Sequence, residues 1–190
     1  DRTYALGMVF LPRKMNQRNF CIEIFETELK RQKLSIIGWR DVPVNEDVVG
    51  DIAKTTLPYI KQIFVKPSSG VIEEDKLNTR AFIARKRAEN VIYKSKMSQS
   101  QYFYLPSFST RTLIYKGLLL PQDIQNFYLD LKDKRVVTRL ALVHQRFSTN
   151  TFPTWDLAQP FRYMCHNGEI NTYKGNCLLY TSDAADERRR

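Results

Sequence analysis

Short apolar runs are interspersed with amphipathic stretches along most of the chain, and this pattern restricts the fold more than any other feature of the sequence. Runs of roughly four to eight apolar or β-branched residues between Pro, Gly and polar breaks are typical of strands. The sequence therefore predicts strands at Tyr4–Leu11, Leu34–Trp39, Ile60–Val65, Tyr102–Phe108, Thr112–Leu118, Arg139–Arg146 and Phe161–His166. We expect Tyr102–Phe108 and Thr112–Leu118 to pair as a hairpin.

Helical periodicity is clearest near the beginning of the chain. Cys21, Phe25 and Leu29 recur at helical spacing, while Glu and Lys occupy the other positions. This pattern predicts a helix that is capped by Asn16 and runs to about Lys33.

Two further helices are expected. Residues 73–96 predict a strand around Ala81–Ala84 followed by a helix rich in Arg and Lys. Pro121 should begin another helix, which ends near Tyr128, because the fixed φ of proline suits the first helical position. No repeat or long linker divides residues 1–176. Residues 177–190 show no hydrophobic period, and we expect them to be disordered and of doubtful origin.

Composition excludes several classes of protein. Hydrophobic residues make up 43% of the chain, as in globular proteins, and no apolar run approaches the roughly 20 residues of a membrane span. The three cysteines are scattered and there are only two histidines, so neither a disulfide framework nor a metal site is expected. We therefore expect a reducing compartment and no membrane partner. The chain begins without Met, which suggests a piece of a longer polypeptide.

The net charge of +10 leaves a nucleic-acid partner open. Basic clusters occur at 85–87 and 132–135. A solvated face, or a face that meets an acidic neighbour, is the favoured explanation, because no stacking-aromatic or basic-helix motif accompanies them. We therefore expect no nucleic acid, and keep a basic nucleic-acid-binding module as an alternative.

Polar side chains concentrate in the segment from Ala141 to Asn176, ALVHQRFSTNTFPTWDLAQPFRYMCHNGEINTYKGN. Buried polar groups cost free energy unless each of them finds a partner. Such a density around short apolar runs indicates a site where a small polar ligand supplies some of those partners. His144 is expected to brace the adjoining loop, and Asp156 to cap a turn.

Arg146 ends a predicted strand and opens a turn-rich loop. Its planar guanidinium can give two hydrogen bonds to one carboxylate. Ser148, Thr149 and Asn150 follow and add groups suited to the two charged ends of an amino acid. A surface salt bridge is the alternative for Arg146.

Asn167-Gly168 follows the last predicted strand and is first of all a hairpin-turn signal. The same geometry lets an Asn amide and a backbone N–H converge on one point, as in an oxyanion hole for acyl transfer. The adjacent Cys165 and His166 would point to opposite faces of a strand, so they do not form a nucleophile–base couple. The residues thus predict a carboxylate clamp and an oxyanion hole without an evident nucleophile.

HQRFSTNTFPTWDLAQPFR followed by HNGEINTYKGN resembles the class II glutamine amidotransferase domain of the glutamate synthase large subunit. The resemblance continues upstream through GMVFLP, GWRDVPV, IFVKP, RKRAEN and SFSTRTLIYKGLLLP, and covers nearly all of residues 4–176. It implies the N-terminal-nucleophile fold, an α+β class with a four-layer αββα sandwich, here incomplete at both ends. In that family an N-terminal cysteine thiol attacks glutamine, with its own α-amino group as the base.

Carried over by position, the resemblance implies roles for six residues. Arg146 would hold the α-carboxylate of L-glutamine, with Thr149 assisting and Phe147 and Asn150 lining the pocket. Asn167 and Gly168 would form the oxyanion hole. No residue matches the cysteine nucleophile, because Cys21 lies in a predicted helix, so this chain alone is expected to be inactive.

The resemblance also implies cofactors and partners that lie outside this chain. Ammonia released from glutamine would add to 2-oxoglutarate at a distant site with FMN and an iron–sulfur cluster. The expected partners are the rest of the glutamate synthase chain and either a small electron-donating subunit or ferredoxin. The expected location is the cytoplasm, or the plastid stroma in a photosynthetic eukaryote. Another class II amidotransferase, such as an asparagine or glucosamine-phosphate synthase, is the alternative enzyme.

Overall fold

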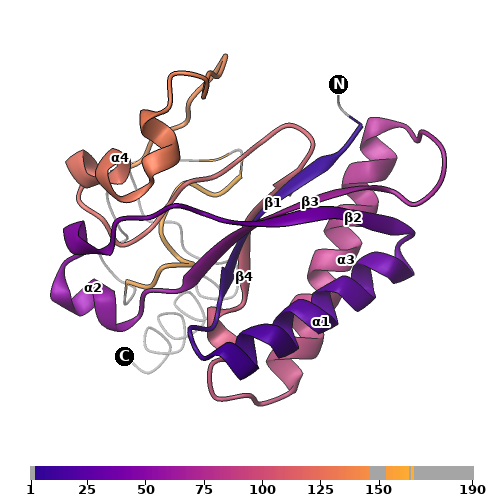
Figure 1. Cartoon of the computed structure of the whole chain (residues 1–190), viewed down its shortest axis with the longest axis horizontal. Helices are drawn as coiled ribbons and strands as arrows, with labels where there is room; N and C mark the ends of the chain where they lie inside the picture. The colour runs from indigo at the N-terminus through magenta and orange to yellow at the C-terminus, as the bar shows by residue number, and fades with distance from the viewer. Residues whose placement is uncertain (1–2, 146–152, 163, 165–190) are drawn as a thin grey trace, which may run out of the picture.

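A computed structural model of the chain describes residues 3–145, 153–162 and 164. Its centre is a four-stranded sheet with the strand order β2-β3-β1-β4 (Figure 1). All neighbouring strands in it are antiparallel. The strands are β1 (Ala5–Leu11), β2 (Leu34–Asp41), β3 (Tyr59–Pro67) and β4 (Tyr104–Ser109).

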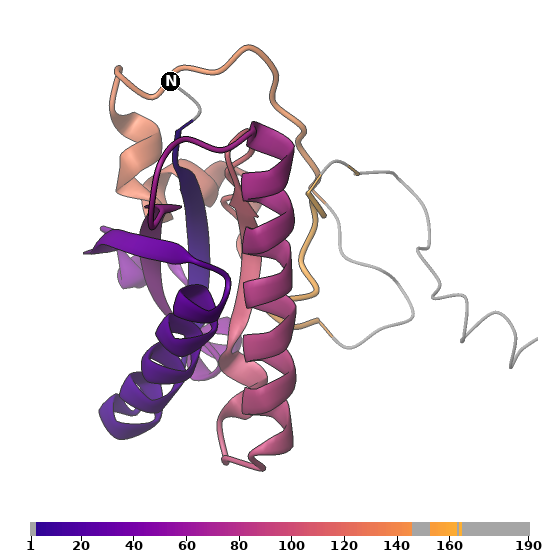
Figure 2. The ribbon, with the colours of Figure 1, turned by 90° about the vertical axis from the view of Figure 1, so that its right-hand side faces the viewer.

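Two long helices, α1 (Met15–Arg31) and α3 (Glu74–Lys94), lie side by side over one face of this sheet (Figures 1 and 2). The period of two along β1 divides its side chains between the two faces. Val9 and Leu11 belong to the core beneath the helices, whereas Phe10 packs on the opposite face.

Aromatic rings and small residues fill the core on the helical side. The Phe25 ring of α1 lies edge-on to Phe103 and Phe108, with centroid distances of 5.9 and 5.6 Å. Helix α3 contributes a stripe of buried residues at helical spacing, Leu77, Ala81, Ala84, Ala88 and Ile92. The small alanines let α3 approach the sheet and α1 closely.

Short elements cover the opposite face of the sheet. They are η1 (Glu46–Val48), α2 (Asp51–Thr55), η3 (Pro121–Asp123), α4 (Ile124–Phe127) and η4 (Leu129–Lys132). A further turn, η2 (Ser100–Tyr102), connects α3 to β4 and contacts α3. A second apolar core forms beneath several of them, made of Met8, Phe10, Val42, Val49, Leu57, Ile60, Phe127, Tyr128 and Trp155.

Several predicted elements are confirmed by the model. The predicted strands at Tyr4–Leu11, Leu34–Trp39 and Ile60–Val65 correspond to β1, β2 and β3. Pro121 begins a helical turn that leads into α4. The first long helix is also confirmed, but Asn16 does not cap it: the N-cap is Lys14, and the Asn16 side chain accepts a hydrogen bond from the next amide, that of Gln17.

The predicted strand at Ala81–Ala84 is wrong, because α3 continues through it without a break. A short apolar run fits a strand or a buried helical face equally well. The helical spacing of buried residues continues on both sides of this run, with Leu77 before it and Ala88 and Ile92 after it, and the helix packs this stripe on one face.

Two other predicted strands are not formed by the described residues. Residues 112–118 follow β4 as an irregular segment outside the sheet, so the expected hairpin is not formed. The Ile114 amide donates to the side-chain hydroxyl of Ser107 in β4 rather than to a backbone carbonyl of that strand. Residues 139–145 are also irregular, and Leu140 and Val143 are 74% and 78% exposed. An apolar run becomes a strand only where a neighbouring strand can pair with it.

The expected α+β class is confirmed by this antiparallel sheet with helices segregated to one face. The described residues build one sheet and one layer of long helices. No helix within the described ranges is long and apolar enough to cross a membrane.

Candidate active site

Residues 153–162, which we call the docked segment, lie in sequence between the predicted carboxylate clamp and the predicted oxyanion hole. Their Trp155 packs into the core on the face of the sheet away from α1 and α3, whereas Arg162 lines a second cavity together with Phe82 and Arg85 of α3. Trp155 is their main anchor, since it is only 3% exposed. Its ring packs against those of Phe10 and Phe127, with centroid distances of 6.5 and 5.6 Å. Its indole N–H donates a hydrogen bond of 3.0 Å to the backbone carbonyl of Ala53 in α2.

A buried lysine provides a second anchor. Lys116 is only 2% exposed, and its Nζ donates a hydrogen bond of 2.6 Å to the backbone carbonyl of Asp156. The ammonium group also lies 4.8 Å from the ring centroid of Tyr104 and 4.6 Å from that of Phe161. The Asp156 carbonyl and the Phe161 ring, both in the docked segment, therefore surround the lysine head together with the Tyr104 ring of β4.

Burial dominates the electrostatics of Lys116. Desolvation lowers its pKa to about 7, although the carboxylate of Asp156 opposes this shift and the guanidinium of Arg162 adds to it. No carboxylate among the described residues lies within salt-bridge distance of Nζ. Burying an ammonium group without a carboxylate partner costs folding free energy. For this reason lysine is rarely buried unless it is paired.

The backbone around Lys116 also makes specific contacts. The buried hydroxyl of Tyr128 donates a hydrogen bond of 2.8 Å to the Lys116 carbonyl. At the next residue, a Cβ on Gly117 would lie 2.4 Å from the six-membered ring of Trp155, which no real Cβ contact allows. Glycine at this position lets the indole approach the backbone.

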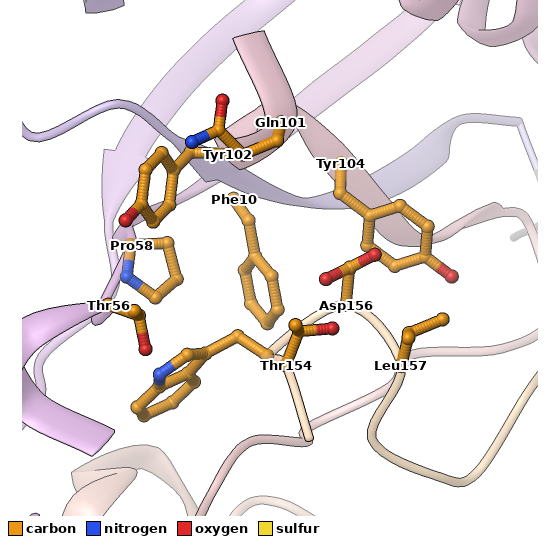
Figure 3. A pocket seen from close by; sticks show the side chains of 10 residues that line it. Phe10, Thr56, Pro58, Gln101, Tyr102, Tyr104, Thr154, Asp156 and Leu157 are labelled. Atoms are coloured by element: carbon orange, nitrogen blue, oxygen red, sulfur yellow. The ribbon is translucent and has the colours of Figure 1, made fainter. Parts of the chain in front are cut away.

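A cavity of about 390 Å³ opens beside the docked segment (Figure 3). Phe10 and Trp155 give it apolar walls, whereas Thr154 and Asp156 bring a hydroxyl and a carboxylate to it. The Thr154 hydroxyl is buried without a hydrogen-bond partner. A largely apolar cavity with a few polar groups is typical of sites for small molecules. The full lining is Phe10, Thr56, Pro58, Gln101, Tyr102, Tyr104, Thr154, Trp155, Asp156 and Leu157.

The residues predicted to bind glutamine lie outside the described residues. This applies to the clamp and its neighbours and to the oxyanion hole, namely Arg146, Phe147, Thr149, Asn150, Asn167 and Gly168. It also applies to Cys165, His166 and residues 177–190. Their roles stay predictions. Within the described part, the structure brings Asp156 to the edge of the cavity, and the turn around it is closed by the Ala158 amide and the Thr154 carbonyl.

Sequence reasoning missed Lys116 and Gly117. The strand predicted at Thr112–Leu118 gave Lys116 no special role, and the structure places it in the core instead. The signal available was a lone lysine between Tyr115 and Gly117 inside an apolar run. A lysine in such a run either snorkels to the surface or is buried for a specific contact.

Several members of the two basic clusters are paired or buried in the described residues. Lys86 pairs with Glu89, and Arg87 pairs with the buried carboxylate of Glu28 at 2.6 Å. Arg85 is buried, and Arg135 pairs with Asp133. These local pairings neutralise part of both clusters and do not favour a nucleic-acid-binding module.

Comparison with known proteins identifies a family. The model of "Glutamine amidotransferases class-II" matches residues 1–187. The chain is 46% identical over 177 residues to the "Glutamate synthase [NADPH] large chain" of Azospirillum brasilense, covering 93% of this chain and 11% of that protein. It is 44% identical over 172 residues to "Ferredoxin-dependent glutamate synthase 2" of Synechocystis sp., covering 90% and 10%.

A third relative, "Glutamate synthase [NADH]" of Saccharomyces cerevisiae, is 41% identical over 181 residues, covering 91% of this chain and 8% of that protein. The chain thus spans about a tenth of the length of the curated relatives it matches.

Proposed function

This chain belongs to the class II glutamine amidotransferases, and we propose on that basis that it forms the glutaminase portion of a glutamate synthase. The proposed reaction is the hydrolysis of L-glutamine to glutamate and ammonia, with the ammonia passed on to 2-oxoglutarate elsewhere in the longer protein. The observation that carries the proposal is the 46% identity to a glutamate synthase large chain across 93% of this chain.

The alternative class II amidotransferases are not favoured. The three relatives described above are named glutamate synthases, and their similarity extends over at least 90% of this chain rather than over the polar segment alone. Their names give three different electron donors, so similarity in this domain does not select among NADPH, NADH and ferredoxin.

The proposed chemistry is acyl transfer. A cysteine thiolate attacks the side-chain carboxamide carbon of glutamine, and the tetrahedral oxyanion is held by the Asn167 amide and the Gly168 N–H. The α-amino group that took the thiol proton returns it to the amide nitrogen, so collapse of this intermediate expels ammonia and leaves a thioester, which water hydrolyses to glutamate and the free thiol. Arg146 binds the α-carboxylate, Thr149 assists, and Phe147 and Asn150 line the pocket.

Cys21 is not suited to the attacking role. It is fully buried in α1 on the helical side of the sheet, and desolvation raises the pKa of its thiol to about 12. A nucleophilic cysteine needs the opposite, a lowered pKa and access to substrate. The proposal therefore assigns the reaction to the N-terminal cysteine that the family provides.

FMN and the iron–sulfur cluster are assigned to the remainder of the longer protein. Among the described residues no group of three or more His, Cys, Asp and Glu could hold a metal ion, so these residues do not fit a cluster and no step here passes through one. The proposed partners are that remainder of the chain and either a small electron-donating subunit or ferredoxin, in the cytoplasm or a plastid stroma.

Glutamine hydrolysis by the complete polypeptide that carries this chain tests the proposal. We expect glutamate and ammonia in equal amounts, and we expect a glutamine-mimicking electrophile to abolish their release. A folded polypeptide that binds no glutamine and releases no ammonia would contradict the assignment.

A further inference from the structure

We propose that the cavity between α3 and β4 binds a phosphate group, which is held by the guanidinium groups of Arg85 and Arg162. The volume of this cavity is about 220 Å³. Sites for drug-sized ligands occupy roughly 300–1,000 Å³, so a smaller cavity suits a small anion. The ligand differs from glutamine, and the inference does not depend on the proposed function.

Arg85 is a buried arginine whose charge is poorly compensated. It is only 3% exposed, and its Nε is buried without a hydrogen-bond partner. Glu89 lies 3.8 Å from this nitrogen, beyond hydrogen-bond distance, and its other carboxylate oxygen receives the ammonium of Lys86 at 2.9 Å. The Phe82 ring centroid lies 5.2 Å from the guanidinium carbon. A buried donor of this kind costs free energy unless an acceptor binds to it.

Arg162 brings a second positive charge to the same cavity, from the docked segment. Backbone hydrogen bonds in both directions between Phe161 and Met164 close a tight turn around it. Arg162 makes no salt bridge with any residue that the structure describes. Burial lowers the pKa of Arg85 and the charge of Arg162 adds to this shift, although Glu89 opposes it. Two cations that line one cavity are stabilised by an anion between them.

The other polar groups of the cavity leave this positive charge in excess. Arg111 also lines the cavity, but Glu74 and Asp75 pair with it at 2.7 and 3.4 Å. The hydroxyls of Ser107 and Ser109 each accept a hydrogen bond from a backbone amide. A hydroxyl that accepts one hydrogen bond still has a proton to donate. The cavity therefore offers guanidinium and hydroxyl donors, the groups that hold phosphate oxygens in proteins.

The number of charges and donors favours phosphate over a carboxylate. A phosphate monoester carries roughly 1.5–2 negative charges at pH 7 and three acceptor oxygens, whereas a carboxylate carries one charge and two oxygens. Two guanidinium groups and the neighbouring hydroxyls match the larger set. Inorganic phosphate and a small phosphate monoester share this chemistry, and the experiment below distinguishes between them.

Arginine modification in the complete polypeptide, with peptide mass spectrometry as the readout, tests the site. Arg162 is exposed, so phenylglyoxal should modify it when chloride is the anion and more slowly when inorganic phosphate replaces chloride at the same ionic strength. Arg139 is also exposed and should react equally under both conditions. Glycerol phosphate provides the second arm, and the more effective of the two compounds identifies the source of the phosphate group.

A variant of the buried arginine links this protection to the cavity. Arg85→Met keeps an unbranched apolar side chain but removes the charge and the donors. The phosphate concentration that half-protects Arg162 should rise at least about tenfold, the order expected from losing a hydrogen bond to a charged group. Arg85→Lys retains a charge and should lose less affinity. Arg139→Met is the matched control and should leave the protection of Arg162 unchanged.

A second variant covers the case in which Arg85→Met does not fold. Arg162→Gln replaces an exposed side chain and preserves the buried one. Equilibrium dialysis with labelled phosphate should then show a similar loss of affinity relative to the unmodified polypeptide, and Arg162→Lys should recover part of it.

Protection of Arg162 by phosphate, and its loss in Arg85→Met or the matching loss of binding in Arg162→Gln, would support the site. Equal modification of Arg162 in chloride and in both phosphate compounds would overturn the proposal. Undiminished protection in folded Arg85→Met would overturn it as well, because the anion would then bind elsewhere. Acetate that protects Arg162 as well as phosphate does would show that the cavity does not select a phosphate group.

Discussion

The indole of Trp155 lies in the space that a side chain on Gly117 would need, with ring atom Cζ3 only 2.4 Å from the position of a Cβ. The segments around Gly117 and Trp155 are far apart in the sequence, and they can pack together only because residue 117 has no Cβ. Because Trp155 also donates to the Ala53 carbonyl, the same contact joins the docked segment to α2.

This packing predicts that Gly117→Ala lowers the free energy of unfolding by about 1–3 kcal/mol, the usual cost of an overpacked site. Chemical denaturation of the purified protein measures it. Trp155→Leu in the same chain should remove most of the added strain, so the two changes together should cost less than the sum of each alone. Strictly additive losses would show that the residues do not compete for space.

Lys116 predicts a pH dependence of stability. Its pKa is about 7 in the folded protein and about 10.5 when exposed, so between these values the unfolded chain binds a proton that the folded chain does not. Stability therefore rises with pH across this window, by up to about 1.4 kcal/mol per unit. Below pH 7 both states are protonated and the full cost of the buried charge remains.

The matched variant for this measurement is Lys116→Met, which lacks the titrating group. Asp156, Arg162 and Tyr104 face the lysine and stay in place in both proteins. The difference in unfolding free energy between wild type and variant should shift in favour of the wild type from pH 7 to pH 10. Parallel stability profiles for the two proteins over that range would mean that the ammonium is not desolvated.

Cys21 is predicted to be chemically silent. Burial raises the pKa of its thiol to about 12, so almost no thiolate is present at pH 8. An alkylating reagent should modify it only after denaturation, as peptide mass spectrometry can show. Cys21→Ala should leave glutamine hydrolysis by the complete polypeptide unchanged. Loss of that activity with the fold intact would give Cys21 a role that its burial does not allow.

Arg146→Ala is predicted to raise the KM for glutamine strongly, because a two-pronged hydrogen bond to the α-carboxylate is removed. The kcat should fall less, since the carboxylate lies away from the reacting carbonyl. Steady-state kinetics of the complete polypeptide distinguish the effect on KM from the effect on kcat. Arg139→Ala, which changes an exposed arginine seven residues earlier in the sequence, is the control and should match the wild type.

The sheet was largely predictable from sequence, because β1, β2 and β3 are apolar runs bounded by turn residues. Helix α1 was predictable for a similar reason, since its apolar positions keep one period. The stretch Ala81–Ala84 within α3 was predicted wrongly, because so short an apolar run suits either a helix or a strand when the spacing of Leu77, Ala88 and Ile92 around it is not taken into account. The strand predicted at residues 112–118 was wrong, because sequence patterns do not reveal which apolar runs pair with a neighbouring strand.

The candidate site divides along similar lines. Its polar motifs could be recognised from residue types and spacing, because the residue type alone determines what amide, hydroxyl and guanidinium groups can donate or accept. Lys116 could not, because its role comes from a contact with Asp156 forty residues later in the chain. A backbone carbonyl as the acceptor leaves no trace in the residue type at position 156.

The most direct test of the central claim is the kcat for glutamine hydrolysis by Asn167→Ala in the complete polypeptide. Loss of one donor to the oxyanion should lower kcat by about 10²–10³ with little change in KM. An unchanged kcat in a folded variant would contradict the claim that this chain carries half of an acyl-transfer site.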